Sequence, residues 1–366
     1  MSHLVRLFCA GVLTFLFVFE AAGAPVVRRG PASGTGSNSR LARAAWASVV
    51  TFSRNGRWLA SRRLQNGDID VWDVTAGKLV RTLPEGGAQS GALAISPDGR
   101  VVASGAGKSI RLWEATTGRE LRAVDAETSE LAYGPDGSRL VAVTPEGVRL
   151  LDASTLQPLL DLSHGAGGQG SAIRFYRARV VFSPDGRLLA AGSNSTIKIW
   201  EVGSGRELRA ITRAESPTMP GHIATLGGIS SLCFSPDGRL LAAGGGSREV
   251  RTWDVSTGRE LLTFSVSAIN ADVIGFSRDG RTLVTKEVFL GRIVEPVITV
   301  WDAVGGKVLG SIPAGHAMSR AVAVMPDADR LAVASEKGVQ IWDIHKRELL
   351  TTLTPAGAST SSKTIN

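Results

Sequence analysis

The stretch LCFSPDGRLLAAGGGSREVRTWDVSTGRELLTF, from Leu232 to Phe264, contains four short apolar runs separated by turn signals. The first run is followed by Pro236-Asp237-Gly238. Proline presets φ, aspartate can bond to its own backbone and glycine accepts a positive φ, so this tripeptide predicts a tight turn. The second run ends in three glycines, and the third is rich in β-branched residues and carries Trp253. The stretch therefore predicts four consecutive short strands.

This unit recurs along the chain. A Trp-Asp pair or a variant of it ends the third run of each copy, at Trp72-Asp73, Trp113-Glu114, Leu151-Asp152, Trp200-Glu201, Trp253-Asp254, Trp301-Asp302 and Trp342-Asp343. A turn of the Pro-Asp-Gly type lies upstream of each pair, and a second short turn lies downstream. Leu151 replaces tryptophan in the third copy and Ala328 replaces the turn glycine in the seventh, but the strand pattern is kept in both.

Repetition of a four-stranded unit determines the expected fold class. One unit cannot bury both of its faces, whereas units that stack in a closed ring bury them against their neighbours and leave only short edges. The chain is therefore expected to be all-β, with a seven-bladed β-propeller of four antiparallel strands per blade over residues 47–353. Each repeat contains its own four runs, so the ring can close without exchange of a terminal strand. Pairing of residues 25–30 with an outer edge is the alternative.

The repeats resemble the WD40-repeat family, in particular bacterial members. The resemblance rests on FSPDGRLLA at residues 182–190 and 234–242, and on IKIWEVGSGREL at residues 197–208. It covers residues 47 to 353 and is specific, because seven copies share two turn motifs and the tryptophan position in one order. It implies a non-catalytic scaffold that binds peptide segments and assembles complexes.

The repeat tryptophans are expected to be structural, because a tryptophan buries roughly 150–250 Å² and can fill the space between neighbouring blades. These residues are Trp72, Trp113, Trp200, Trp253, Trp301 and Trp342. An aromatic binding surface is the alternative interpretation. The resemblance also implies a hydrogen-bond network of the tryptophan with a Gly-His histidine, a strand Ser or Thr and a turn Asp. Only His222 and His316 follow a glycine, so few or no complete networks are expected.

The N-terminal residues have the order of an export signal. Arg6 precedes an apolar run over residues 7–19, and small residues follow at 21–24. A run of 13 residues is shorter than the roughly 20 that span a bilayer. Residues 1–24 are thus expected to be a signal peptide, with an uncleaved membrane anchor as the alternative. Residues 25–46 are expected to be a flexible lead-in and residues 354–366 a disordered tail, so the propeller is expected to be periplasmic or extracellular.

The charge is basic, with 41 Lys and Arg against 33 Asp and Glu, formally +8. Because strands alternate in direction, the turns after the first and third strands emerge on one face, and most of these turns carry Arg or Lys. This face could attract anionic partners. Acidic residues of the same turns offset part of the charge, and no aromatic residues interleave with the arginines for base stacking, which argues against specific nucleic-acid binding.

The sequence indicates no catalytic, cofactor or metal site. The histidines are not spaced as metal ligands, no Gly-x-Ser-x-Gly motif stands in a strand–turn–helix context, and no Gly-Lys-Ser/Thr follows the glycine-rich residues 165–170. Cys233 lies in a predicted innermost strand and is most simply a small buried apolar residue. A propeller enzyme with a cluster at the central channel remains the competing class, because such residues could converge in space.

The other face carries three long connections, at residues 163–178, 212–228 and 285–296. Function concentrates on variable loops over a rigid scaffold, and aromatic residues and arginine anchor interfaces. The predicted partner-binding residues are Phe175, Tyr176, Arg177, Met219, His222, Phe289 and Arg292. A protein or peptide partner of a monomeric platform is therefore expected, with neutral insertions and an anion-binding arginine face as alternatives.

Overall fold

The apolar runs of the repeats form strands and the turn signals form turns. The computed structural model describes residues 47–63, 66–85, 91–162, 179–213, 228–246, 248–266, 268, 270–288, 297–313, 322–325, 329–335 and 338–354. These residues form twenty-eight strands and no helix, so among them no helical segment could cross a membrane. The predicted leader, lead-in and tail lie outside the described residues, apart from residue 354.

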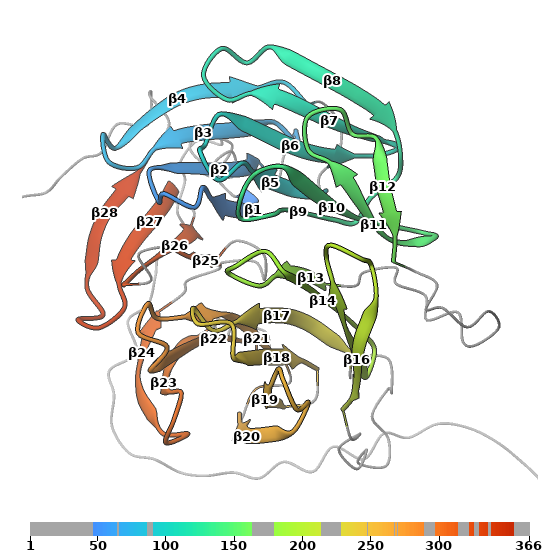
Figure 1. Ribbon diagram of the computed structural model, residues 1–366. Helices are drawn as coiled ribbons and strands as arrows, with labels where there is room; N and C mark the ends of the chain where they lie inside the picture. The colour runs from blue at the N-terminus through green and yellow to red at the C-terminus, as the bar shows by residue number, and fades with distance from the viewer. Residues whose placement is uncertain are drawn as a thin grey trace, which may run out of the picture. The chain divides into compact units, whose positions relative to one another are not determined.

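Each repeat folds into one blade of four antiparallel strands in chain order (Figure 1). Blades 1 and 2 consist of β1 (Ala47–Phe52), β2 (Trp58–Arg63), β3 (Ile69–Asp73), β4 (Lys78–Leu83), β5 (Leu93–Ile95), β6 (Val101–Ala106), β7 (Ser109–Glu114) and β8 (Glu120–Asp125). Blades 3 and 4 consist of β9 (Glu130–Tyr133), β10 (Arg139–Thr144), β11 (Gly147–Asp152), β12 (Pro158–Asp161), β13 (Arg179–Phe182), β14 (Leu188–Ser193), β15 (Thr196–Glu201) and β16 (Glu207–Thr212).

The last three blades follow the same order. They consist of β17 (Ile229–Phe234), β18 (Leu240–Gly245), β19 (Glu249–Asp254), β20 (Glu260–Ser265), β21 (Asn270–Phe276), β22 (Thr282–Val288), β23 (Val297–Asp302), β24 (Val308–Pro313), β25 (Val322–Val324), β26 (Arg330–Ser335), β27 (Gly338–Asp343) and β28 (Leu349–Leu353). One backbone pairing, Gly245 with Ala271, joins the sheets of blades 5 and 6. Because β22 extends to Val288, the connection expected from residue 285 begins only at residue 289.

The innermost strands close the ring. Each first strand contacts the first strand of the next blade, and β25 of the seventh blade contacts β1. Apolar residues of adjacent blades form a shared core at each interface; at the closing interface, Trp72 and Leu59 pack with Ile341 and Leu353. Each blade consists of four strands of its own repeat, including the first and last blades, so among the described residues the ring closes without strand exchange.

The third and fourth strands of every blade share a register shift at the tryptophan position. Val71 pairs with Arg81, for example, but Trp72 pairs with Leu79, so one residue of the outer strand has no partner. Leu151 shows the same shift in the third blade. The bulge turns an apolar side chain outward, and six of these bulge residues are among the exposed large apolar residues: Leu121, Leu159, Leu208, Leu261, Leu309 and Leu350. Such bulges blunt the exposed edges of sheets.

Hydroxyl and carboxylate groups hold the turns between first and second strands. The Ser235 hydroxyl donates to Asp237 at 2.5 Å, while the backbone N–H groups of Arg239 and Leu240 donate to Asp237 and Ser235. Gly238 follows with φ of +73°. The hydrogen bond from Ser235 holds the pKa of Asp237 below its usual value. Similar Ser–Asp contacts recur in blades 2, 4 and 6.

Candidate functional site

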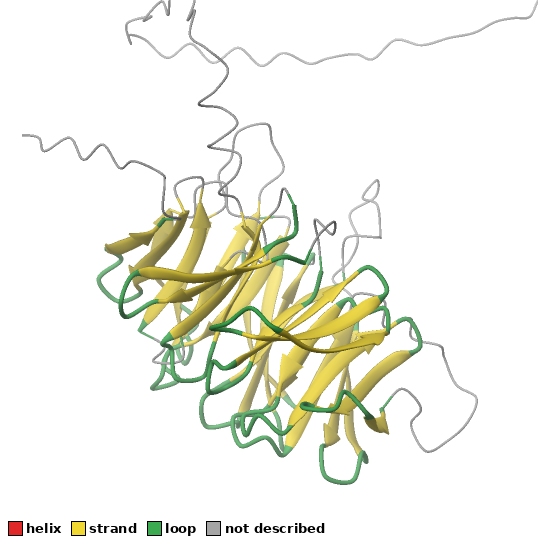
Figure 2. Cartoon of the chain, turned by 90° about the horizontal axis from the view of Figure 1, so that it is seen from above, coloured by secondary structure: helices red, strands yellow, loops and turns green. Residues whose placement is uncertain are grey.

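The seven predicted partner-binding residues all lie outside the described residues, and their role stays a prediction. The strand ends that flank them can be placed. In each blade the second and fourth strands end, and the first and third begin, at one face of the ring, which we call the loop face; we call the opposite face the turn face (Figure 2). Residues 163–178, 214–227 and 289–296 each connect strands at the loop face.

A central channel opens between the innermost strands. It holds a cavity of about 240 Å³ that is lined by residues of all seven blades. At blades 7, 1 and 2 its lining is mostly apolar and includes Val322, Val49 and Leu93. At blades 3 to 6 the lining combines apolar side chains with the polar residues Glu130, Arg179, Ser230 and Asp272, which we call the polar arc.

Direct contacts connect the members of the polar arc. Arg179 forms an ion pair with Glu130 at 2.6 Å and donates from Nε to the backbone oxygen of Ser230 at 2.5 Å. The Ser230 hydroxyl donates to Asp272, which also accepts from Asn270 at 3.3 Å. These contacts extend across four blades, so the arc links the innermost strands as well as lining the channel.

Burial changes the electrostatics of the arc. It raises the pKa of Glu130, although the Arg179 guanidinium opposes this shift. Lys286 pairs with Asp272 across β21 and β22, and its side chain is buried. Burial lowers the pKa of Lys286 to about 8 against the opposing effect of Asp272. Lys286 does not line the cavity, so the charges of both signs that a ligand can contact there are those of Arg179, Glu130 and Asp272.

The polar arc lies at the loop-face end of the channel, because Glu130 and Arg179 are the first residues of β9 and β13. Arg179 directly follows residues 163–178, where Phe175, Tyr176 and Arg177 were predicted to bind a partner. None of the four residues of the arc was predicted as a site residue from the sequence. A usable signal was present, because Glu130 and Arg179 each stand directly before an apolar run, five residues before a turn proline.

The repeat tryptophans lie between blades rather than on an aromatic surface. Trp72, Trp113, Trp200, Trp253 and Trp301 are buried, and Trp342 is half-buried. Three indole N–H groups donate to a hydroxyl on the neighbouring strand: Trp72 to Ser61, Trp113 to Ser104 and Trp301 to Thr285, at 2.8–2.9 Å. In blades 4 and 5 the equivalent strand positions carry Ala191 and Ala243, which have no hydroxyl.

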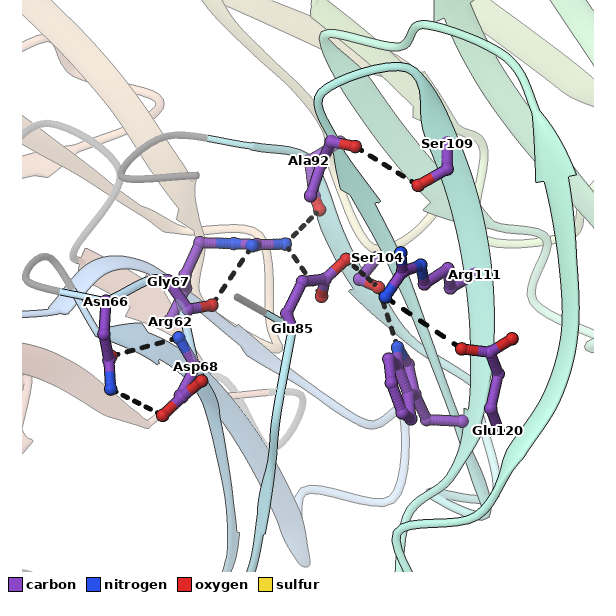
Figure 3. Close-up of polar contacts among 12 residues, drawn as sticks. Arg62, Asn66, Gly67, Asp68, Glu85, Ala92, Ser104, Ser109, Arg111 and Glu120 are labelled. Atoms are coloured by element: carbon purple, nitrogen blue, oxygen red, sulfur yellow. Dashed lines mark hydrogen bonds and ion pairs between the residues drawn. The ribbon is translucent and has the colours of Figure 1, made fainter. Parts of the chain in front are cut away.

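At blades 1 and 2 the hydrogen bonds of a tryptophan continue into a buried ion pair (Figure 3). The Ser104 hydroxyl accepts from Trp113 and donates to Glu85 at 2.7 Å. Glu85 lies 3.5 Å from Arg62, and both side chains are 0% exposed. Arg62 also donates to the backbone oxygens of Gly67 and Ala92. A glutamate and an arginine thus extend this network, whereas the family pattern implied a histidine and an aspartate.

The turn face carries arginine side chains whose charge is partly offset by nearby aspartates and glutamates, as its turn sequences indicate. Arg57 donates to Asp73 at 2.9–3.0 Å. Looser pairs join exposed side chains in other blades: Arg100 with Asp98, Arg119 with Glu114, Arg206 with Glu201 and Arg239 with Asp237, at 3.6–4.0 Å. Exposed pairs of this kind contribute little to stability, so their charges are available to a partner.

Residues with possible reactivity have structural surroundings. Cys233 is half-buried in β17, packs against the core of blades 5 and 6, and has a thiol pKa raised by burial. His345 is exposed, with Nε2 at 3.2 Å from Asp329. Within the described ranges, no three His, Cys, Asp or Glu side chains are grouped closely enough to hold a metal ion. His3, His164, His222 and His316 fall outside those ranges.

Comparisons with known proteins agree with this architecture. The family model "WD domain, G-beta repeat" matches residues 77–114, 177–201 and 215–254. The chain is 31% identical over 274 residues to the small ribosomal subunit protein RACK1 of Caenorhabditis elegans, an alignment that covers 69% of this chain and 75% of that protein. Among solved structures, it is similar to the β-propeller domain of Cps50 (Swd1) from Myceliophteria thermophila, with a TM-score of 0.64, 19% identity and coverage of 82% and 98% of the two chains.

Other relatives are matched over a smaller share of their length. The chain is 40% identical over 108 residues to human apoptotic protease-activating factor 1, covering 29% of this chain and 8% of that protein. It is 28% identical over 171 residues to the target of rapamycin complex subunit wat1 of Schizosaccharomyces pombe, covering 46% and 48%. The chain thus spans less than a tenth of the first protein and about half of the second.

Proposed function

This chain belongs to the WD40-repeat family, and on that premise we propose that it is a non-catalytic scaffold that binds protein or peptide partners through its loop face. The observation that carries the proposal is the position of the polar arc. Arg179 is the first residue of β13 and Ser230 is the second residue of β17, and these two strands follow two of the three long connections. A rigid ring therefore presents hydrogen-bonding and charged groups beside the segments in which Phe175, Tyr176, Arg177, Met219 and His222 occur.

The relatives support a role in assemblies. One is named as a small ribosomal subunit protein and another as a complex subunit. A propeller suits this role because its frame is fixed by blade-to-blade packing while its connections vary. We propose that Phe289 and Arg292 contribute to the same face, that the chain is monomeric, and that it binds neither a resident cofactor nor specific nucleic acid.

We also propose that the protein is a bacterial member of the family that is exported to the periplasm or the outside of the cell. Residues 1–24 support export, because a charged residue, a short apolar run and small residues follow one another there. Mass spectrometry of the protein from each cell fraction tests this. A mature form that begins near residue 24 outside the cytoplasm is expected; an intact N-terminus in the membrane fraction would instead indicate an anchor.

A pull-down from the envelope fraction of the producing cell tests the binding face. The intact mature protein is compared with a variant in which residues 163–178, 214–227 and 289–296 are replaced by short turns, which leaves β22 and its Thr285 intact. A partner that the intact protein captures and the trimmed variant does not, with an unchanged circular dichroism spectrum, is the expected result. Equal capture by both forms would exclude the loop face.

A second pair of variants tests the polar arc. Glu130→Gln with Arg179→Met removes both charges of the channel ion pair while keeping side-chain size. Glu201→Gln with Arg206→Met removes an exposed pair on the turn face and serves as the matched control. The first double variant should lose the captured partner and the second should retain it. Retention by both would remove the arc from the proposed binding surface.

A further inference from the structure

A groove of about 710 Å³ lies between blades 4 and 5 at the turn face. Its floor is apolar and includes Leu188, Ile199 and Val255. The bulge residue Leu208 lines it from the outer strand of blade 4 and is 41% exposed. The size and lining of this groove are typical of a binding site for a side chain or small molecule.

The equivalent space between blades 1 and 2 is occupied by a side chain of the protein itself. Trp58 and Leu188 hold the same place in their blades, because each begins the second strand and pairs with the residue after the repeat tryptophan. The Trp58 ring lies against the turn glycine of the next blade: a Cβ atom on Gly99 would be 2.0 Å from its Cδ1 atom. Gly238, the corresponding turn glycine, lines the groove at blades 4 and 5. The chain therefore contains its own example of an indole seated at this position.

The rim of the groove adds a charge preference. Arg209 crosses the interface and donates to the backbone oxygens of Ser256 and Thr257, which fixes its guanidinium at the groove. Its Nε atom is buried without a hydrogen-bond partner. Arg239 lies on the other side and is 84% exposed. Asp254 is the one acidic lining residue, and Ser256 and Thr257 donate to it.

At the interface between blades 1 and 2, where Trp58 occupies the space, a cation contacts the indole ring. The Arg57 guanidinium lies 5.1 Å from the Trp58 ring centroid, within the range of a cation–π contact. The counterpart of Arg57 at the open groove is Arg187, which precedes Leu188, and the turn of the neighbouring blade adds Arg239 to the lining. An aromatic side chain that enters the groove would meet an apolar floor and a cationic rim, and acidic residues beside it would complement Arg209 and Arg239.

We propose that this groove binds a linear peptide of a partner protein by seating one tryptophan side chain that is flanked by acidic residues. The proposal extends the proposed scaffold function to a second surface, on the face opposite the three long connections. Its test uses a synthetic peptide and no loop variant. The two proposals can therefore fail independently.

The probe is a fluorescein-labelled peptide of sequence Glu-Asp-Trp-Asp-Glu, with its binding to the mature protein followed by fluorescence anisotropy. Leu188→Trp should fill the groove from within, as Trp58 fills the equivalent space, and weaken binding by about tenfold or more. Replacement of the peptide tryptophan with alanine should have a similar effect. Binding should also weaken as the salt concentration is raised, because salt screens the attraction between Arg239 and the acidic residues of the peptide.

Two matched pairs keep the test decisive if Leu188→Trp does not fold, as judged by circular dichroism. Arg239→Glu should weaken binding by about threefold or more, whereas Arg100→Glu, an equally exposed arginine on the same turn of blade 2, should not. Leu208→Ala should weaken binding, whereas Leu261→Ala, the bulge leucine of blade 5, should not. A wild-type protein that does not bind the peptide, or variants that bind it as their controls do, would overturn the proposal.

Discussion

The interfaces between blades 1 and 2 and between blades 4 and 5 have the same backbone but different chemistry. At the loop-face end of the first, Arg62, Glu85 and Ser104 form a buried network. In the second, Gly192 and Ala243 take the places of Arg62 and Ser104 in the strand register. Arg213 takes the place of Glu85, because Leu83 and Ile211 pair with equivalent third-strand residues and each is followed two residues later by Glu85 or Arg213.

At the turn-face end the same contrast appears, with Trp58 seated in one interface and a groove beside Leu188 in the other. At the loop-face end of the interface between blades 4 and 5, Arg213 donates to the backbone oxygen of Glu249, while its Nε and Nη1 atoms are buried without a hydrogen-bond partner. The comparison teaches that the repeat maintains the strand register, and that a few side chains decide whether an interface is filled and satisfied or left open. Four predictions test this, in order of decreasing effect.

Removing the carboxylate of the first interface should have the largest effect. Glu85→Ala leaves Arg62 buried without its ion-pair partner, and we expect a loss of about 3–5 kcal/mol in the free energy of unfolding, measured by urea denaturation. Glu114→Ala, which removes an exposed pair with Arg119, should cost about 1 kcal/mol or less. The double variant Arg62→Met, Glu85→Leu should recover most of the loss. A single variant as stable as the wild type would show that the pair does not hold this interface.

Lys286 extends the comparison to blade 6, since it follows the tryptophan-bonded Thr285 as Arg62 follows Ser61. Its pKa is lowered to about 8 from 10.5, so between these pH values the folded chain has lost a proton that the unfolded chain retains. The contribution of Lys286 to stability should therefore increase as pH rises through this window, by up to about 3 kcal/mol. Lys286→Met should remove this increase, measured as the difference between wild-type and variant denaturation at pH 7.5 and 10. A difference that does not change with pH would contradict the prediction.

Removing a serine hydroxyl that bonds a repeat tryptophan should lower the free energy of unfolding by a smaller amount, which depends on how many hydrogen bonds that hydroxyl makes. Ser104→Ala removes a donor to Glu85 and the acceptor of the Trp113 indole, and we expect a cost of about 1–3 kcal/mol. Ser61→Ala removes the acceptor of the Trp72 indole and should cost about 1 kcal/mol. Thermal unfolding of both variants measures which substitution costs more stability. Equal costs would mean that the contact of Ser104 with Glu85 adds nothing.

The smallest effect is expected at Asp254, on the rim of the open groove. Hydrogen bonds from Ser256 and Thr257 lower the pKa of its carboxyl from 3.8 to about 2. Its contribution to stability is complete above the unfolded pKa and is lost as pH falls through the folded value. Asp254→Asn should therefore reduce the loss of thermal stability between pH 4 and pH 2. An unchanged acid profile would show that these turn bonds do not stabilise the folded chain.

Local signals allowed the frame to be predicted from the sequence. The Pro-Asp-Gly turns and the tryptophan spacing indicated four strands per repeat and seven blades, because turn chemistry and alternation act over a few residues. The register shift before each tryptophan had no such signal, since it depends on the pairing of two strands. The extent of β22 was also misjudged: Glu287 pairs with Val297, so strand pairing includes residues that were assigned to a loop.

The sequence by itself determined the repeat, the order of the strands and the cationic character of the turn face. Only the tertiary structure decided which side chains meet. Glu130, Arg179, Ser230 and Asp272 come from four repeats and form one arc because ring closure brings the starts of their strands around one channel. Whether an interface holds an indole, as at Trp58, or a groove, as at Leu188, depends on packing between neighbouring blades, which no single repeat contains.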